Sequence, residues 1–127
     1  MQITFSGPAQ AVTGSCHILE VGGRTLMLVL GLFQGRRADS RRKNEVLPLP
    51  VDRIEAIVLS HAHIDHAGRL PFLVESGYAG NIHSTAATHE LCAIMLADSA
   101  RIQVKDADLA AKGYHCTVPA PGDQVTL

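Results

Sequence analysis

Three histidines and one aspartate, packed into residues 61–66, are the side chains of this sequence best suited to chemistry. They follow an apolar run, residues 56–59, that is typical of a buried strand. Residues two apart on extended backbone point the same way, so His61 and His63 can reach one metal ion. Asp65 and His66 lie past the strand, where the chain turns, and can reach a second metal ion. The spacing predicts a loop-borne hydrolytic site with two metal ions.

A helical zinc site and a purely structural role both fit this cluster less well. The helical His-Glu-x-x-His arrangement needs metal ligands four residues apart on one helix face, and the spacing here is different. A structural role would bury several polar groups together, which is costly unless each finds a partner. We therefore interpret the cluster as a metal-binding site.

Short strands are expected to position this cluster. Residues 2–5, 16–21 and 25–30 have strand character, and the glycine pair 22–23 predicts a hairpin turn between the second and third. Residues 25–30 are nearly all apolar, which predicts cover on both faces. A further strand, residues 55–59, leads directly into the cluster.

Helices are expected after the cluster. One is predicted over residues 68–75, followed by a brief strand at 82–83. Thr85 is a candidate cap for a second helix over residues 88–103. Apolar side chains recur along this helix at a spacing typical of core packing, namely Leu91, Cys92, Ile94, Met95 and Ile102. Residues 124–127 have strand character, and the whole order of elements favours an α/β layered fold.

Composition limits the class of protein. The chain has 127 residues, 46% hydrophobic and 18% charged, which fits one globular domain. Three cysteines without a Cys-x-x-Cys pair argue against a disulfide framework or a zinc ribbon. The N-terminus lacks signal-peptide features, and the longest apolar run, residues 26–33, is too short to span a bilayer. We expect a cytoplasmic protein with reduced thiols and no membrane partner.

A net charge of −1 gives no general attraction for nucleic acid, so any such contact must come from a local patch. Residues 35–44 are expected to form a polar loop with five basic side chains, Arg36, Arg37, Arg41, Arg42 and Lys43. These are candidates for contact with a phosphate backbone, although a solvated loop is the favoured interpretation of a charge run.

Four segments together resemble a known family. They are residues 61–66 (HAHIDH), 12–17 (VTGSCH), 31–35 (GLFQG) and 68–71 (GRLP). The first resembles the signature of the metallo-β-lactamase superfamily. The other three are similar to its beta-CASP branch, which contains RNA-processing nucleases.

The resemblance implies an αββα sandwich, of which this chain is the N-terminal half, with a mixed sheet and flanking helices. It implies two Zn²⁺ ions, the first bound by His61 and His63 and the second by Asp65 and His66. Asp65 is also implied to be catalytic, because it orients the hydroxide that attacks phosphorus. Imidazole and carboxylate ligands suit Zn²⁺, and the implied substrate is RNA or another phosphodiester.

The chain departs from the family pattern near the cluster. Val29 and Leu30 stand where the family carries an aspartate, usually followed by a cysteine, and Ala11 stands where a glutamate is common. Val29 cannot accept the hydrogen bonds that the aspartate receives from the metal loop. Losses of such supporting contacts commonly weaken metal affinity or activity by roughly 10–100-fold.

The length of the chain leads to a further expectation. The family's remaining ligands come from later strands, so residues 1–127 are expected to be a partial domain without those strands and without the beta-CASP insert. His115 is the sole late candidate ligand and is expected to be a surface residue. We expect the isolated chain to be a weak catalyst or inactive.

Two alternatives stay open. The same superfamily also suits a thioester or lactam substrate, although the resemblances at residues 12–15 and 68–71 weigh against this. The second alternative is that the chain is a non-catalytic remnant or module. A half-sandwich exposes an apolar sheet face, which a homo-oligomer would cover.

Overall fold

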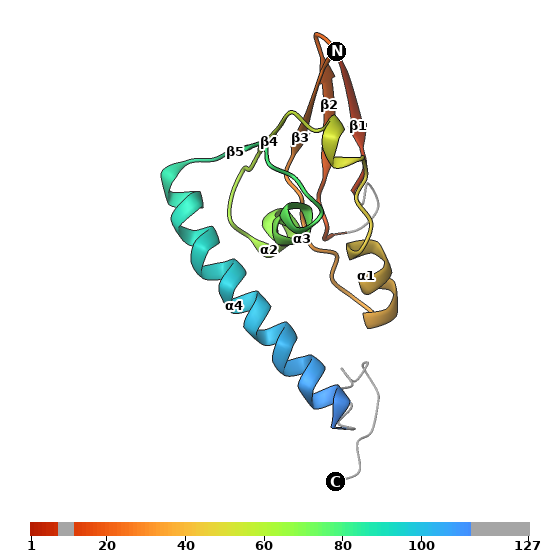
Figure 1. Ribbon diagram of the computed structural model, residues 1–127, viewed down its shortest axis with the longest axis vertical. Coiled ribbons are helices and arrows are strands. Elements are labelled where there is room, and N and C mark those ends of the chain that lie inside the picture. Colours follow the sequence, from red (N-terminus) through yellow and green to blue (C-terminus); the bar gives the residue numbers. More distant parts are fainter. Residues whose placement is uncertain (8–11, 113–127) are drawn as a thin grey trace.

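The computed structural model describes residues 1–7 and 12–112. Their five strands form one sheet, namely β1 (Gln2–Phe5), β2 (His17–Val21), β3 (Arg24–Leu28), β4 (Ala56–Val58) and β5 (Asn81–His83). The helices are α1 (Arg37–Asn44), the 3-10 helix η1 (Val51–Arg53), α2 (Ile64–Ala67), α3 (Leu70–Glu75) and α4 (Ala86–Ala111). Figure 1 shows the strands gathered at one end of the molecule, and α4 extending from there toward the opposite end.

The sheet is mixed, and its strand order follows the sequence. β1, β2 and β3 pair antiparallel, whereas β3, β4 and β5 pair parallel. The predicted α/β class, with a mixed sheet and flanking helices, is therefore confirmed. The predicted hairpin is confirmed too, because Val21 pairs with Arg24 and both Gly22 and Gly23 have positive φ, 57° and 77°.

β3 ends two residues earlier than the sequence predicts. Val29 has φ 54°, a left-handed conformation that a β-branched residue rarely adopts, so the chain leaves the strand after Leu28. The Val29 side chain is nevertheless buried, with 6% exposed. The chain therefore turns toward the histidine cluster through a strained residue.

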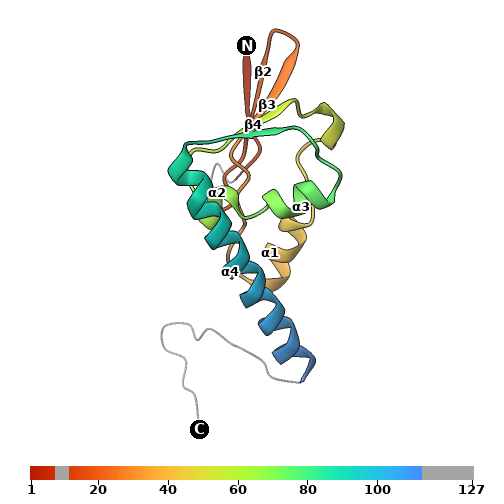
Figure 2. The same cartoon turned by 60° about the vertical axis from the view of Figure 1, so that its left-hand side comes forward.

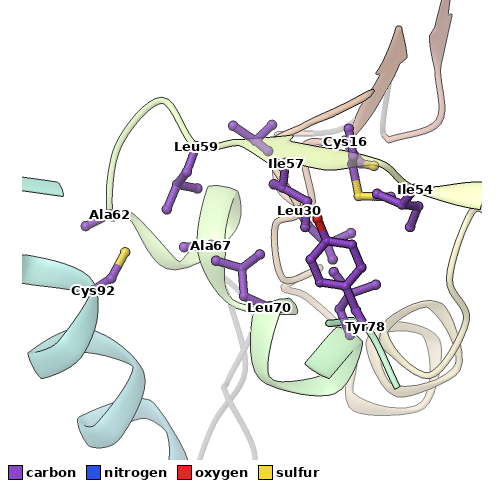
Figure 3. Close-up of a cluster of buried hydrophobic side chains, with 13 residues drawn as sticks. Cys16, Leu30, Ile54, Ile57, Leu59, Ala62, Ala67, Leu70, Tyr78 and Cys92 are labelled. Atoms are coloured by element: carbon purple, nitrogen blue, oxygen red, sulfur yellow. The ribbon is translucent and has the colours of Figure 1, made fainter. Parts of the chain in front are cut away.

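The core lies on one face of the sheet. Ile18, Met27 and Ile57 stand in register on this face and are buried, and Met27 and Ile57 share one core cluster with side chains of α2 and α3. Figure 3 shows Ile57 and Leu30 facing Tyr78 and Leu70 in this core. Burial of these side chains is what attaches the short helices to the sheet.

The opposite face of the sheet is less covered. The prediction that residues 25–30 are covered on both faces is wrong for the outer side chains. Leu26 and Leu28 are half-buried, and Val58 beside them is 42% exposed. The core cluster to which α2, α3 and α4 contribute includes Met27 but none of these three side chains.

α4 extends the predicted helix at both ends. Its cap is confirmed, because the Thr85 hydroxyl oxygen accepts a hydrogen bond from the Thr88 N–H at 3.2 Å. The predicted core stripe is wrong for Leu91, Ile94, Met95 and Ile102, which are 54%, 68%, 39% and 52% exposed.

The helix instead meets the core through three side chains spaced four apart, Thr88, Cys92 and Leu96. In both views α4 passes α2 with its first turns and then runs past the rest of the described fold (Figure 2). Of its remaining apolar side chains, Met95 and Ile102 line an open groove that α1 and α3 border on the other side.

The polar segment 35–44 differs from its prediction, whereas the helix at 68–75 is confirmed. Residues 35–44 are not a loop, because Arg37–Asn44 forms α1, to which the ion pair between Arg41 and Glu45, 2.8 Å, adds support. The single helix predicted over residues 68–75 is confirmed as α3, and a further helix, α2, precedes it from Ile64 to Ala67, where the sequence predicted a turn. The predicted strand at 124–127 and His115 lie outside the described residues. None of the described helices is long and apolar enough to cross a membrane.

Candidate metal centre

The segment that carries the histidine cluster, residues 60–66, is held by backbone hydrogen bonds on both sides. Before it, the Leu59 N–H donates to the carbonyl of His83 in β5, at 2.8 Å. Within it, the carbonyls of Ile64, Asp65 and His66 accept from three N–H groups at 2.8–3.0 Å, those of Leu32, Ser15 and Leu30. Backbone from the segments around β2, β3 and β5 therefore frames the cluster.

The surroundings of Gly31 explain why the segment 31–35 (GLFQG) begins with a glycine. A Cβ atom at this position would overlap the carbonyl group of Asp65. The Gly31 N–H meanwhile donates to the carbonyl of Ser15 at 2.8 Å. The backbone at Gly31 therefore cannot move away from Asp65 without breaking this hydrogen bond. A glycine is required because two stretches of main chain lie in direct contact.

Arg69 is a supporting residue for which the sequence predicted no role. Its side chain is buried, with Nε donating to the Gly31 carbonyl at 2.7 Å and Nη1 to the Val46 carbonyl at 2.9 Å. The guanidinium carbon also lies 4.9 Å from the centroid of the Phe33 ring. Burial lowers the pKa of Arg69, and the neighbouring Cys16 opposes that shift.

A signal for Arg69 was present in the sequence. An arginine directly before the apolar helix residues of α3 cannot point to water as easily as one on an exposed face. Its partners are carbonyls of residues far away in the sequence, which no local pattern identifies.

The structure brings the four predicted ligands together. The ring centroids of His61 and His63 are 4.7 Å apart, and those of His61 and His66 are 4.1 Å apart. Asp65 Oδ2 lies 3.4 Å from His66 Nε2. Asp65 and His66 are half-buried, whereas His63 is exposed, so the cluster opens to solvent on one side.

The electrostatics of the cluster favour a neutral imidazole at its centre. Burial lowers the pKa of His66 below its ordinary value. The nearby Asp65 opposes this shift, while positive charge on His61, His63 or His17 adds to it. A neutral imidazole is the form that can bind a metal ion.

The residue types of the cluster fit zinc, since imidazole and carboxylate are its usual ligands besides thiolate. His66 Nδ1 is buried without a hydrogen-bond partner among the described residues, which marks unused bonding capacity. The geometry fits less well. Across residues 1–7 and 12–112, no three histidine, cysteine or acidic side chains are arranged to hold one metal ion. The assignment of His61, His63, Asp65 and His66 as ligands therefore stays a prediction.

The five basic candidates differ in their surroundings. Arg41 is paired with Glu45, and the Lys43 ammonium lies 5.5 Å from the centroid of the Phe33 ring. Arg36 and Arg42 are exposed, and the side chain of Arg37 lies outside the described part. Contact of this group with nucleic acid stays a prediction.

Comparison with known proteins shows to which superfamily the chain belongs. The model of the family described as "Metallo-beta-lactamase superfamily" matches residues 11–122, and the chain belongs to this superfamily. The family resemblance stated from the sequence motifs is thereby confirmed, including that to the beta-CASP branch of RNA-processing nucleases.

The chain is similar to several curated proteins. It is 40% identical over 102 residues to Ribonuclease TTHA0252 of Thermus thermophilus, covering 80% of this chain and 23% of that protein. It is 33% identical over 109 residues to Integrator complex subunit 11 of Danio rerio, covering 82% and 18%. It is 25% identical over 134 residues to Transcription termination factor FttA of Methanosarcina mazei, covering 99% and 21%. The chain thus spans about a fifth of the length of these curated relatives.

Proposed function

We propose that the chain carries part of a zinc-dependent ribonuclease of the metallo-β-lactamase fold. The single observation that carries this proposal is the gathering of His61, His63, Asp65 and His66 in one framed segment. The similarity to a protein named as a ribonuclease supports RNA as the substrate class. The exposed side of the cluster, at His63, leaves access for a substrate.

Each side chain has a role in this proposal. His61 and His63 would hold one zinc ion, and Asp65 and His66 a second. Zinc, when bound, supplies a nucleophile at neutral pH and stabilises charge that develops at the phosphorus. Asp65 already lies beside His66, and its carboxylate can hold and orient a proton.

The proposal includes a weak activity for the isolated 127-residue chain, as a partial domain. The chain spans about a fifth of the relatives that it matches, so the proposed active site needs more protein than residues 1–127. Val29 adds a local reason, because a buried hydrocarbon beside the framed segment cannot accept a hydrogen bond from it.

Substrate class is tested by cleavage. Residues 1–127 would replace the matching part of the Thermus relative, and the hybrid would be assayed on an RNA oligonucleotide and on a thioester, with and without added zinc. We expect zinc-dependent cleavage of RNA and none of the thioester. Hydrolysis of the thioester alone would favour the other substrate class, and robust RNA cleavage by residues 1–127 alone would contradict the proposed weakness.

A second, non-catalytic function is favoured by the less covered sheet face. Leu26, Leu28 and Val58 form an apolar strip there, which a second copy of the chain could cover. Sedimentation velocity of the chain and of a Val58→Lys variant would test this. A dimer that the substitution dissociates would support self-association, and a compact monomer at all concentrations would argue against it.

A further inference from the structure

An open groove lies between α4 and the shorter helices α1 and α3, and none of the four predicted metal ligands lines it. Its volume is about 850 Å³, and its lining follows α4 from Met95 to Ala107. At a rise of 1.5 Å per residue, this stretch of helix is about 18 Å long. Both views show α1 and α3 on the same side of α4 (Figure 1, Figure 2). The groove is therefore long and has helices along both walls.

The floor of the groove is apolar and partly open to solvent. Met95 and Ile102 lie about two turns apart on one face of α4 and are 39% and 52% exposed. From the opposite side, Leu32 and Phe72 are half-buried and line the same groove. Apolar side chains that gather on one concave surface, rather than being scattered singly, indicate an interaction site.

The two arginines that line the groove already have partners within the chain. Arg41 forms an ion pair with Glu45 at 2.8 Å. Arg69 is buried and donates hydrogen bonds to the carbonyls of Gly31 and Val46. Positive charge in the groove is therefore balanced or bound by the fold itself.

Three exposed carboxylates give the rim of the groove a negative charge, namely Glu75 on α3 and Asp98 and Asp106 on α4. None of the three takes part in an ion pair with another residue of the described segments. Asp98 and Asp106 are separated by a little more than two turns, about 12 Å along α4. They flank the apolar side chains of Met95 and Ile102. The groove therefore combines an apolar floor with a negatively charged rim.

We propose that this groove binds an amphipathic helix of a partner protein, whose apolar face packs on Met95 and Ile102 and whose basic side chains pair with Asp98 and Asp106. A helix of about four turns spans the lined stretch of α4. Helices that lie in apolar grooves are a common mode of peptide recognition, and complementary charge fixes their register. The proposal concerns other side chains than those of the histidine cluster and does not depend on the proposed function.

Other occupants match the charge of the rim less well. Phosphate groups of a nucleic acid would be repelled by the carboxylates. A second copy of the chain would offer its own α4 as the amphipathic helix. That helix carries four acidic and two basic side chains, so it would bring like charge to the rim. A partner helix with an excess of lysine or arginine has the charge that the groove needs.

Peptide binding tests the proposal directly. The probe is a fluorescein-labelled helical peptide of about 14 residues, with leucine on one face and lysine on both flanks. One comparison peptide has glutamate in place of lysine, and another has the same composition in scrambled order. By fluorescence anisotropy, we expect saturable binding of the lysine peptide alone, weakened by added salt. Absence of this binding, or equal binding of either comparison peptide, would overturn the proposal.

Charge variants of α4 show where the peptide binds. Asp98→Asn/Asp106→Asn should weaken binding of the lysine peptide about fivefold, the effect expected from the loss of two exposed ion pairs. Glu90→Gln/Asp108→Asn is the matched control, because it removes two exposed carboxylates of α4 that do not line the groove. It should leave the affinity unchanged. Equal weakening by the two double variants would mean that the peptide responds to total charge, and would overturn the proposal.

An apolar position in the groove gives a second comparison. Met95→Gln should weaken peptide binding about tenfold, because it makes the apolar floor polar. Ile94→Gln is the control, since the neighbouring Ile94 is 68% exposed and does not line the groove. Circular dichroism checks that both variants keep their helix content. Equal affinity of the Met95→Gln variant and the unmodified chain would overturn the proposal.

Sedimentation velocity without peptide tests the second copy as the occupant. We expect Met95→Gln to leave the oligomeric state of the chain unchanged. A dimer that Met95→Gln dissociates and Ile94→Gln does not would show that the groove binds another copy of the chain, and would overturn the assignment of a basic partner helix.

Discussion

The cluster segment, residues 60–66, and helix α4 are held in the fold by different means. Four main-chain hydrogen bonds tie the cluster segment and its leading residue to Ser15, Leu30, Leu32 and His83, each from another part of the chain. α4 satisfies its main chain internally and meets the core through three side chains. Main-chain pairing therefore adds to the burial of Leu59 and Ala62 in fixing the cluster, whereas α4 depends on side-chain contacts along its first half.

This difference predicts where substitutions act strongly. In the frame of the cluster, a change that touches the main chain disturbs several strands at once. Along α4, most positions face solvent, and Figure 3 shows Cys92 as the labelled side chain of α4 that reaches the core, near Ala62. Substitutions in both regions, together with a change of pH, test that contrast, and Gly31 is where the largest effect is expected.

Gly31→Ala is expected to be the most damaging change. The new Cβ would overlap the Asp65 carbonyl, so the unfolding free energy in urea should fall by roughly 3 kcal/mol, at the upper end for overpacking. Gly77→Ala is the matched control, since Gly77 also has a demanding backbone, φ 100°, but open space around it. Its cost should be about 1–2 kcal/mol. Equal costs at the two positions would show that the Gly31 contact does not frame the cluster.

Arg69→Met is expected to cost roughly 2 kcal/mol. It keeps the apolar part of the side chain but leaves the carbonyls of Gly31 and Val46 without their charged donor. Arg41→Met is the control, because that arginine is exposed and pairs with Glu45 alone. Chemical unfolding measures both. A change for Arg69→Met as small as that of the control would contradict its role in the frame.

Cys16 makes the stability of the fold depend on pH in the alkaline range. Burial raises the pKa of its thiol from 9.0 to about 11, and Arg69 opposes the shift. The unfolded chain therefore loses this proton first. The contribution of the neutral thiol to stability is complete below pH 9 and declines as the pH rises through 11, by up to about 1.4 kcal/mol per pH unit. Urea unfolding at pH 8 and pH 10 should show this decline in the unmodified chain and a smaller one in Cys16→Ala. Parallel curves would contradict it.

Val29→Asp is expected to strengthen metal binding about tenfold. Aspartate tolerates the left-handed backbone at this position better than valine, and its carboxylate can accept hydrogen bonds near the cluster. Val29→Asn, uncharged but of similar shape, shows how much of the gain comes from charge. Titration with zinc against a chelating dye measures both. Unchanged or weaker zinc binding by the aspartate variant would show that position 29 does not limit the site.

Ile94→Ser should change stability by less than about 0.5 kcal/mol, because the side chain is 68% exposed on α4. Leu96→Ser, two residues along the same helix, is the matched comparison, since Leu96 packs against the core. It should cost clearly more. A large loss for Ile94→Ser in thermal unfolding would mean that the exposed stripe of α4 is covered in solution.

The sequence predicted the strands well, and also that the four side chains at residues 61–66 lie together, because both depend on local patterns. The glycine pair at the hairpin, the apolar run before the cluster and the Thr85 cap each act within a few residues. The α4 stripe was misjudged because helical spacing identifies an apolar face but not whether another layer covers it. Arg69 was missed because its partners lie far away in the sequence. α1 was missed because its helix is polar on most sides and lacks a strong periodic signal.

The content of zinc per chain tests the central claim most directly. Tag-free protein, purified with zinc in the medium, would be measured by mass spectrometry of metals, beside a His61→Ala/His63→Ala variant. His89→Ala, with an exposed histidine on α4, serves as the control. We predict at least one zinc ion per chain in the unmodified protein and the control, and a clear loss in the double variant. Zinc near zero in the unmodified chain, or retained by the double variant, would contradict the assignment of residues 61–66 as a metal site.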